Sequence, residues 1–204
     1  MIINNCEQRS DEWYIKKAGV PSASNFDKII TAKGEPSKQR KKYLYQLVGE
    51  KLLGRMPETY MSWAMERGVE LEDEAIAYFS LKQGVEVQRV GICFKDERMD
   101  RSCSPDGLIY EMDSIEGLEV KCPILTTHVE YLMNNKLPTA YYQQVQGSMY
   151  VTGVSYWWFM SYFPGLPPLI IRCERDEGFI EKLDRELDML VEDLDIIKEK
   201  LKCE

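Results

Sequence analysis

The stretch IEGLEVKC at positions 115–122 predicts a β-strand that carries charged side chains within an apolar run. Because side chains alternate between the two faces of a strand, Glu119 and Lys121 point to one side, whereas Leu118 and Val120 point into the opposite layer. A carboxylate and an ammonium group therefore share one surface of a strand that is otherwise suited to a core. This strand is the first candidate for a functional site.

A second carboxylate is expected beside Glu119. Residues 104–110 also form an apolar segment, and the short connection 111–114 joins it to residues 115–122, which predicts a hairpin. Asp106, near the start of the first strand, would then lie next to Glu119, near the end of the second. Two adjacent carboxylates are costly unless a cation neutralises them, and oxygen ligands of this kind suit Mg²⁺.

Such a site has the chemistry to cleave phosphodiesters. A metal ion held by Asp106, Glu119 and the backbone carbonyl of Val120 would stabilise charge on a phosphate and lower the pKa of an attacking water. Lys121 could orient or deprotonate that water. The alternative, an ordinary ion pair on a solvent-facing strand, stays open on these residues alone.

Helical periodicity places two more polar residues near apolar faces. Glu72 follows the apolar Leu71 on a helix predicted from about Tyr60 to residue 81, so it borders the buried stripe of that helix. The alternative is that Glu72 belongs to a solvated acidic face. Gln144 lies on the polar side of a helix predicted from Pro138 to about residue 152, which is a generic signal.

The remaining pattern predicts one α/β domain over residues 1–204, with a mixed sheet between helices, because no repeat or linker divides the chain. A first helix, capped by Ser10 or Asp11, carries Trp13, and a second begins at residues 22–24 and carries Phe26. The other predicted helices span residues 43–53 and 179–201, and the other strands span residues 85–94, 154–163 and 169–173.

Composition excludes several classes of protein. The 204 residues are 44% hydrophobic, which is enough for a substantial core, and no run approaches the roughly 20 apolar residues of a membrane span. The N-terminus lacks the apolar region of a signal peptide, so we expect a soluble intracellular protein. Six cysteines without a C-x-x-C pair and a single histidine do not match a zinc site, and the thiols are expected to be reduced.

The formal net charge is −8, but the charge is unevenly distributed. Residues 1–55 contain 11 Lys or Arg and 6 Asp or Glu, whereas residues 174–204 contain 6 and 12. The N-terminal third could therefore form a phosphate-binding surface, because salt screens fields beyond about 10 Å. A solvated lysine-rich face is the alternative, and the acidic face of the last helix needs no functional explanation.

Two conspicuous features are expected to be structural. His128 follows the candidate strand, but Lys121 already supplies a group that can act on the water. The aromatic run at residues 156–159 could stack on nucleic-acid bases, yet its position in a predicted strand favours packing in the core.

Several segments together resemble the phage lambda exonuclease, or YqaJ-type viral recombinase, family. They are SCSPDGL at 102–108, GLEVKCP at 117–123 and QVQGSMYVT at 144–152, in the order and spacing of that family. The similarity also covers two upstream segments, one from Trp13 through the SAS sequence at 22–24 and one in which Arg67-Gly68 is followed by Glu72. In all it extends over about residues 9–200.

The resemblance implies a restriction-endonuclease-like PD-(D/E)xK fold and a role for each matching residue. Asp106, Glu119 and the Val120 carbonyl would hold Mg²⁺, with Mn²⁺ able to substitute, and two ions are implied. Lys121 would assist the nucleophile. Glu72 would support the second ion or the waters bound to it. Gln144 would help to position the attacking water or the substrate.

Ser24 matches the serine that the family is expected to place near a terminal 5′ phosphate, and Lys17 stands where a phosphate-contacting arginine is expected. This lysine is the clearest departure from the family pattern. It keeps the charge but loses the planar bidentate fork, so recognition of the end would be weaker or would use Arg9 or Lys16.

The resemblance further implies an exonuclease that digests the 5′ strand of linear duplex DNA in the 5′ to 3′ direction and leaves 3′ tails for recombination. It also implies that the protein forms ring-shaped homotrimers and transfers the tail to a single-strand annealing protein. A phage or prophage origin, with action in the bacterial cytoplasm, is implied as well. Two other functions stay open: a PD-(D/E)xK endonuclease with the same metal site, and a catalytically silent module that binds DNA ends.

Overall fold

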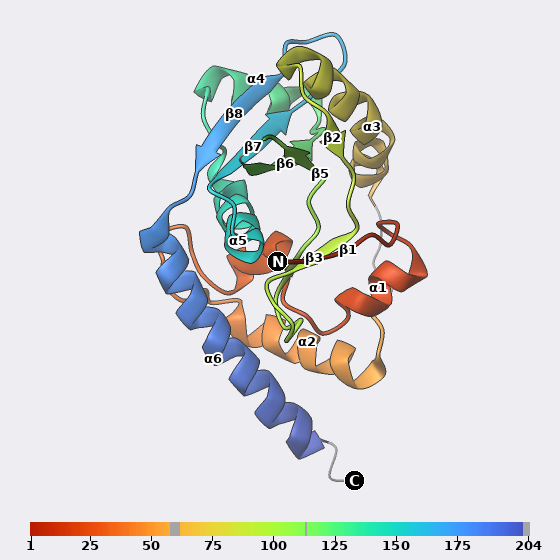
Figure 1. The fold of residues 1–204 in the computed structure, drawn as a ribbon. Coiled ribbons are helices and arrows are strands. Elements are labelled where there is room, and N and C mark those ends of the chain that lie inside the picture. The colour runs from red at the N-terminus through yellow and green to blue at the C-terminus, as the bar shows by residue number, and fades with distance from the viewer. Residues whose placement is uncertain (58–61, 113, 202–204) are drawn as a thin grey trace.

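The structure, a computed structural model, describes residues 1–57, 62–112 and 114–201 and is drawn in Figure 1. Within these residues the helices are α1 (Asp11–Lys17), η1 (Ala23–Lys28, a 3₁₀ helix), α2 (Arg40–Leu53), α3 (Trp63–Gln83), α4 (Leu125–Asn134), η2 (Thr139–Tyr141, 3₁₀), α5 (Tyr142–Thr152) and α6 (Glu177–Leu201). The strands are β1 (Ile2–Asn4), β2 (Val87–Gln88), β3 (Ile92–Phe94), β4 (Ser102–Cys103), β5 (Gly107–Tyr110), β6 (Ile115–Lys121), β7 (Tyr156–Ser161) and β8 (Leu169–Glu174).

The larger sheet has five strands in the order β2-β5-β6-β7-β8, and β6 lies at its centre. The pair β6–β7 is parallel and the other pairs are antiparallel, so the sheet is mixed. On one face, Leu118 and Val120 pack with Phe79 of α3. On the other face, Val145 of α5 packs with Phe159 of β7. The predicted mixed α/β fold, with the sheet between helices, is confirmed, and β6 is the strand that both layers cover.

One predicted strand divides between two sheets, and another is shorter than expected. Residues 85–94 form β2 in the large sheet and β3 in a three-stranded sheet of order β1-β3-β4. Residues 104–110 were expected to be one strand, but β5 begins only at Gly107, and β4 before it belongs to the small sheet. The chain passes tightly between the sheets at Gly91, where an added Cβ would lie 2.1 Å from the carbonyl oxygen of Cys6.

The predicted helices are largely confirmed, with shifted ends. Ser10 caps α1 by accepting a hydrogen bond from the backbone N–H of Trp13, and α3 ends at Gly84 in the left-handed conformation (φ 70°). The expected start of α3 at about Tyr60 lies outside the described residues. The helix expected after residues 22–24 is a 3₁₀ helix without a side-chain cap from Ser22. Helix α4 was not predicted.

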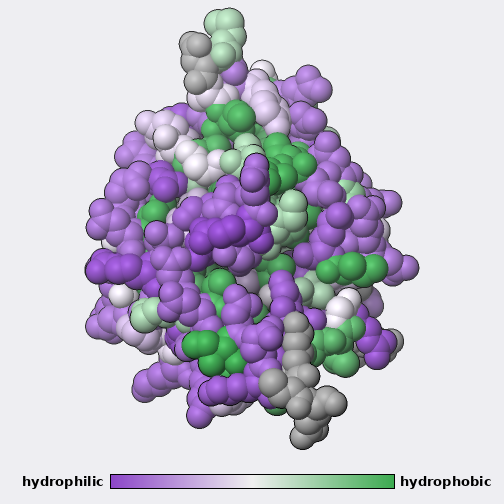
Figure 2. Space-filling model, turned by 60° about the horizontal axis from the view of Figure 1, so that its bottom comes forward, coloured by the Kyte–Doolittle hydropathy of each residue, from purple (hydrophilic) through white to green (hydrophobic). Residues whose placement is uncertain are grey.

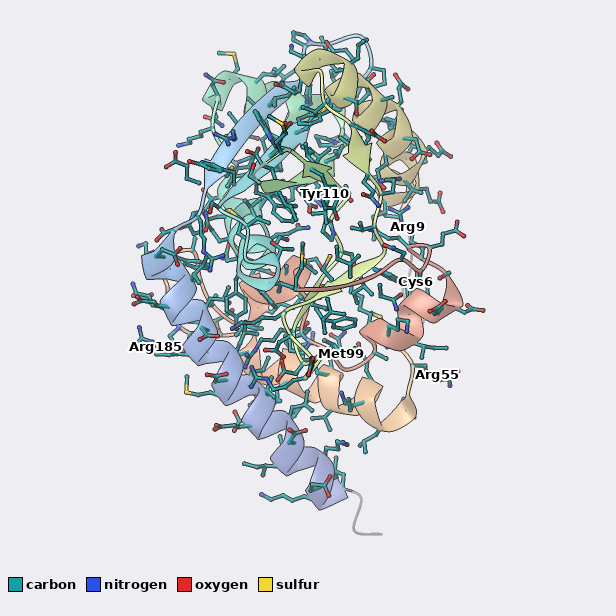
Figure 3. The ribbon with its side chains drawn as sticks, in the orientation of Figure 1. Cys6, Arg9, Arg55, Met99, Tyr110 and Arg185 are labelled. Carbon is teal, nitrogen blue, oxygen red and sulfur yellow. The ribbon has the colours of Figure 1, made fainter. Side chains whose placement is uncertain are left out.

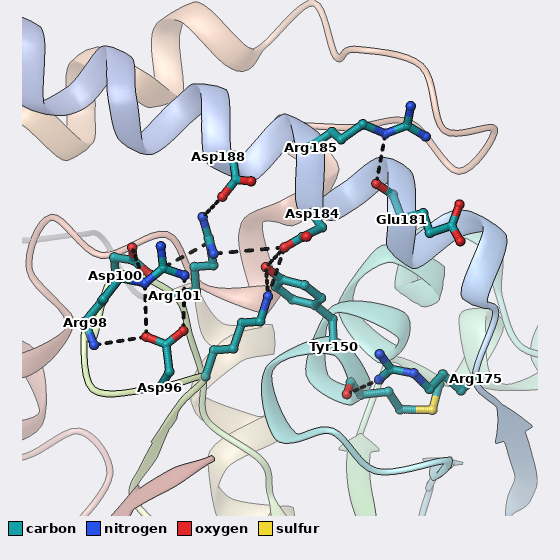
Figure 4. A network of polar contacts seen from close by, with 12 residues as sticks. Asp96, Arg98, Asp100, Arg101, Tyr150, Arg175, Glu181, Asp184, Arg185 and Asp188 are labelled. Atoms are coloured by element: carbon teal, nitrogen blue, oxygen red, sulfur yellow. Dashed lines mark hydrogen bonds and ion pairs between the residues drawn. The ribbon is translucent and has the colours of Figure 1, made fainter.

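The long helix α6 lies along one side of the molecule and packs against α2 (Figure 1). Acids on its polar side also make structural contacts. Asp184 accepts hydrogen bonds from Lys95 and Tyr150, and Asp188 pairs with the buried Arg101 (Figure 4). These acids therefore join α6 to the loop between β3 and β4 rather than only keeping the helix soluble.

The face drawn in Figure 2 is mostly hydrophilic. In the face drawn in Figure 2, hydrophobic residues form small groups separated by polar side chains. In the described part of the chain, no helix combines the length and the hydrophobicity needed to cross a bilayer.

Candidate active site

Asp106 is held at the entrance to β5 by contacts with β6. Its backbone N–H donates to the carbonyl oxygen of Leu118 at 3.1 Å. Its carboxylate oxygen Oδ2 accepts the backbone N–H of Val120 at 2.6 Å. The predicted hairpin thus brings Asp106 beside the strand that carries Glu119, although Asp106 precedes the strand β5 instead of belonging to it.

Glu119 and Lys121 project from β6 toward the face of the sheet that α5 covers. Glu119 is only 2% exposed, and its Oε1 accepts hydrogen bonds from Lys121 and, at 2.5 Å, from Gln144 of α5. Lys121 also lies over the ring of Tyr141, with Nζ 5.3 Å from the ring centroid. The structure therefore brings together four of the residues predicted from the sequence: Asp106, Glu119, Lys121 and Gln144.

The electrostatics of this cluster follow from burial and close charges. Burial, together with the charge of Glu119, raises the pKa of Asp106 well above its usual range. Burial alone would lower the pKa of Lys121, but the Glu119 and Asp106 carboxylates outweigh it and raise that pKa. Lys121 is therefore a cation that neutralises only part of the negative charge.

The donor set fits a hard divalent cation. Among the described residues, Oδ1 of Asp106 and Oε2 of Glu119 receive no hydrogen bond, so each carboxylate has one oxygen available. No group of three or more His, Cys, Asp or Glu side chains in the described ranges could by itself enclose a metal. Two carboxylates, one backbone carbonyl and several waters are the kind of environment in which proteins hold Mg²⁺.

Glu72 of α3 lies between two arginines. It is 9% exposed, in contrast to its exposed neighbours Asp73 and Glu74, which confirms that it borders the buried stripe. Its Oε2 lies 2.6 Å from Arg9 and its Oε1 lies 2.7 Å from Arg89. Burial opposes ionisation, but the two arginines lower the pKa of Glu72.

Glu72 and its two arginines line a cleft of about 450 Å³. Figure 3 places Arg9 in the segment between β1 and α1. Arg9 has a left-handed backbone (φ 68°), which is uncommon for a residue with a side chain. A metal ligand role for Glu72 would require one arginine to release a carboxylate oxygen, whereas an outer role through water would not.

Lys17 and Ser24 lie on adjoining elements at the N-terminal side. The ammonium of Lys17 sits 4.2 Å from the ring centroid of Trp13. Burial lowers the pKa of Lys17 to about 8, partly offset by Cys103 and Glu119. Ser24 is exposed on η1. Its hydroxyl lies 3.5 Å from that of Ser22, which lines the same small hollow as Lys17.

His128 and two of the four rings of the aromatic run are buried, whereas Tyr156 and Trp158 are half-buried. His128 is fully buried, and its ring nitrogens contact the Ser161 hydroxyl at 2.8 Å and the Pro167 carbonyl oxygen at 3.0 Å. Trp157 and Phe159 of β7 are also fully buried. Neither the histidine nor these two aromatic rings are available to act on a substrate.

The sequence did not reveal Arg89 and Gln8, whose side chains contact the site residues or the backbone next to them. Arg89 contacts Glu72 and the carbonyl oxygen of Asp106, and Gln8 contacts the carbonyl oxygen of Pro105. A basic residue inside the apolar segment 85–94 was the only signal for Arg89, and it does not reveal a partner. Gln8 gave no signal.

Comparison with known proteins identifies the family of this chain. The YqaJ-like viral recombinase domain matches residues 12–155, which is most of the chain and includes each residue of the cluster around Glu119. A search of curated proteins gives no match.

Solved structures support the same assignment. The alkaline exonuclease LHK-Exo from Laribacter hongkongensis is 30% identical, with a TM-score of 0.84 over 95% of this chain and 96% of that one, and it has also been crystallised with dAMP. A phage-related exonuclease from Haemophilus somnus 129PT shares the fold, with 16% identity and a TM-score of 0.70 over 89% of this chain and 96% of that one. The chain therefore belongs to the YqaJ-like viral recombinase family.

Proposed function

We propose that this protein is a metal-dependent exonuclease that degrades the 5′ strand of linear duplex DNA in the 5′ to 3′ direction. The observation that carries the proposal is the cluster of Asp106, Glu119, Lys121 and Gln144 on one hairpin and the helix over it. The 30% identity to an alkaline exonuclease over almost the whole chain supports the same class of reaction. The 3′ tails left by such digestion would serve recombination by strand annealing.

Asp106, Glu119 and the Val120 carbonyl would hold Mg²⁺, with Mn²⁺ as a substitute, and Glu72 would support a second ion through its waters. The bound metal supplies charge stabilisation at the phosphate and a water of lowered pKa. The amide of Val120 holds one oxygen of Asp106, so the other oxygen would be the one left to bind the metal.

The remaining side chains of the cluster act on the water and the phosphate. The Glu119 and Asp106 carboxylates raise the pKa of Lys121 while no metal is bound. Lys121 would orient the attacking water and contact the scissile phosphate. Gln144 holds Glu119 and directs its second oxygen.

Recognition of the DNA end is assigned to Lys17 and Ser24. The lysine lies close enough to Glu119 for their charges to interact, which supports binding of a 5′ phosphate beside the cluster. Arg9, with its side chain 40% exposed, is the second candidate. On family likeness we also propose a homotrimer and a single-strand annealing partner.

Two other functions use the same residues. An endonuclease would need the same metal site but would cut circular DNA, and a silent end-binding module would bind without cutting. Asp106, Glu119 and Lys121 are all present and in contact, which favours a working site over a silent one.

The substitution Asp106→Asn tests the proposed metal site. It removes the charge but keeps an acceptor for the Val120 amide, so the fold should survive. We expect Mg²⁺-dependent digestion of linear duplex to fall by more than the roughly 10- to 100-fold that loss of an outer-shell partner costs. The exposed Glu111→Gln on the same hairpin is the matched control and should keep full activity. Full activity of Asp106→Asn would refute the assignment.

A further inference from the structure

One guanidinium joins α3 to the start of β5. Arg89 lies between β2 and β3, and its Nη1 donates to Glu72 Oε1 at 2.7 Å and to the backbone oxygen of Asp106 at 3.0 Å. Its Nη2 donates to Asp73 at 2.7 Å. Arg89 therefore contacts two acids of the proposed site, Glu72 through its carboxylate and Asp106 through its backbone oxygen.

A second side chain holds the preceding peptide group. Gln8 Nε2 donates to the carbonyl oxygen of Pro105 at 2.8 Å and to that of Val90 at 2.9 Å. The carbonyls of two consecutive residues, Pro105 and Asp106, are thus both fixed by side chains from remote segments. In addition, Trp13 Nε1 donates to the hydroxyl of Ser104 at 3.0 Å.

These contacts fall on the link between the two sheets. Residues 104–106 connect β4 of the small sheet to β5 of the large sheet and belong to neither strand. The direction of the Asp106 carboxylate depends on this link, on the hydrogen bond from its own backbone N–H to Leu118 and on the hydrogen bond from Val120. A rotation of the link would therefore redirect the free oxygen Oδ1.

The contact of Arg89 with Asp73 should add little to stability. The side chain of Arg89 is 46% exposed and that of Asp73 is 87% exposed, and exposed ion pairs contribute at most about 1 kcal/mol. The contacts with Glu72, whose side chain is 11% exposed, and with the backbone oxygen of Asp106 are the ones that fix two acids of one site relative to each other.

We propose that Arg89 is a positioning residue of the metal site, which sets the orientation of Asp106 and Glu72, and that Gln8 supports it at Pro105. This inference rests on the proposed metal-dependent function. The planar guanidinium is required because it makes all three contacts at once, which the single ammonium of a lysine cannot reproduce.

The test measures Mn²⁺ binding without DNA, by the electron paramagnetic resonance signal of the free ion, alongside the Mg²⁺ dependence of digestion. In Arg89→Gln we expect the Mn²⁺ dissociation constant and the half-saturating Mg²⁺ concentration to rise by roughly 10- to 100-fold. Saturating Mg²⁺ should restore most of the rate. The control is Arg98→Gln, which removes an arginine with a 59% exposed side chain. Within the described ranges Arg98 pairs only with Asp96 and Asp100, so its loss should leave both values unchanged.

The outcomes separate this inference from the proposed function. A protein with the unchanged sequence that neither binds Mn²⁺ nor digests DNA would overturn the proposed function. Unchanged metal binding in Arg89→Gln, with an active unsubstituted protein, would overturn only the positioning role. If Arg89→Gln fails to fold, Arg89→Lys decides: weakened Mn²⁺ binding supports the role and unchanged binding contradicts it.

Discussion

At the scale of single residues, the carboxylates of the site are distinguished by their partners. Glu119 is bound by an ammonium and an amide, Asp106 by a backbone N–H, and Glu72 by two guanidinium groups. A cation held by Asp106 and Glu119 would offset the burial that raises the pKa of Asp106. Glu72, already neutralised by arginines, has no such need, which fits an outer position.

Lys17 gives a pH dependence that can be measured. With a free-state pKa of about 8, its charge is present below pH 8 and lost above it. A phosphate bound to Lys17 would raise that pKa, so binding weakens as the pH rises. We expect KM for 5′-phosphorylated duplex to increase by up to about tenfold between pH 7 and pH 9, because the charged fraction of Lys17 falls by about tenfold over that range.

Two comparisons isolate the contribution of Lys17. In Lys17→Arg the cation stays charged, so the increase in KM should disappear, and a duplex with a 5′ hydroxyl should show little of it with either protein. The same pH profile of KM for Lys17→Arg and the unsubstituted protein would assign the 5′ phosphate to another residue, with Arg9 as the next candidate.

At the scale of elements, the central hairpin could be predicted from the sequence, and the division into two sheets could not. Alternating polarity and a short connection are sufficient to pair β5 with β6. In contrast, the apolar character continues through residues 85–94, so nothing in the pattern marks where the chain leaves one sheet for the other. The same limit applies to Arg89, whose partner Asp106 is 17 residues away.

The packing of β6 against β7 makes a prediction about Gly117. An added Cβ there would lie 2.2 Å from a ring atom of the fully buried Trp157. Gly117→Ala should therefore lower the free energy of unfolding by about 1–3 kcal/mol, the usual cost of overpacking. Because Glu119 is two residues away on the same strand, activity should also fall.

The control is Gly49→Ala in α2, where no atom lies within 4 Å of the added Cβ. Alanine favours a helix over glycine, so this change should raise the free energy of unfolding by about 0.5–1 kcal/mol. Urea unfolding of both variants is the measurement. A Gly117→Ala protein as stable as the unsubstituted one would show that β7 can move away from β6 at little cost.

At the scale of the whole molecule, the N-terminal segment connects the proposed end-binding residues to the hairpin of the proposed metal site. Gln8, Arg9 and Trp13 contact Pro105, Glu72 and Ser104, respectively, and α1 continues directly to Lys17. In the proposed function, recognition of the DNA end and cleavage would therefore be carried by parts of one continuous arrangement. This long-range connection depends on tertiary contacts that local sequence patterns do not contain.

The central claim, that this arrangement degrades DNA from an end with the help of a metal, is tested most directly with one plasmid in two forms. The linear form carries a label at each 5′ or each 3′ end, and the other form is covalently closed. With Mg²⁺, we predict early release of the 5′ label from linear duplex, late release of the 3′ label, no cutting of the circle, and no release with Lys121→Ala. Rapid cutting of the circle, or release of the 5′ label without a divalent metal, would contradict the account.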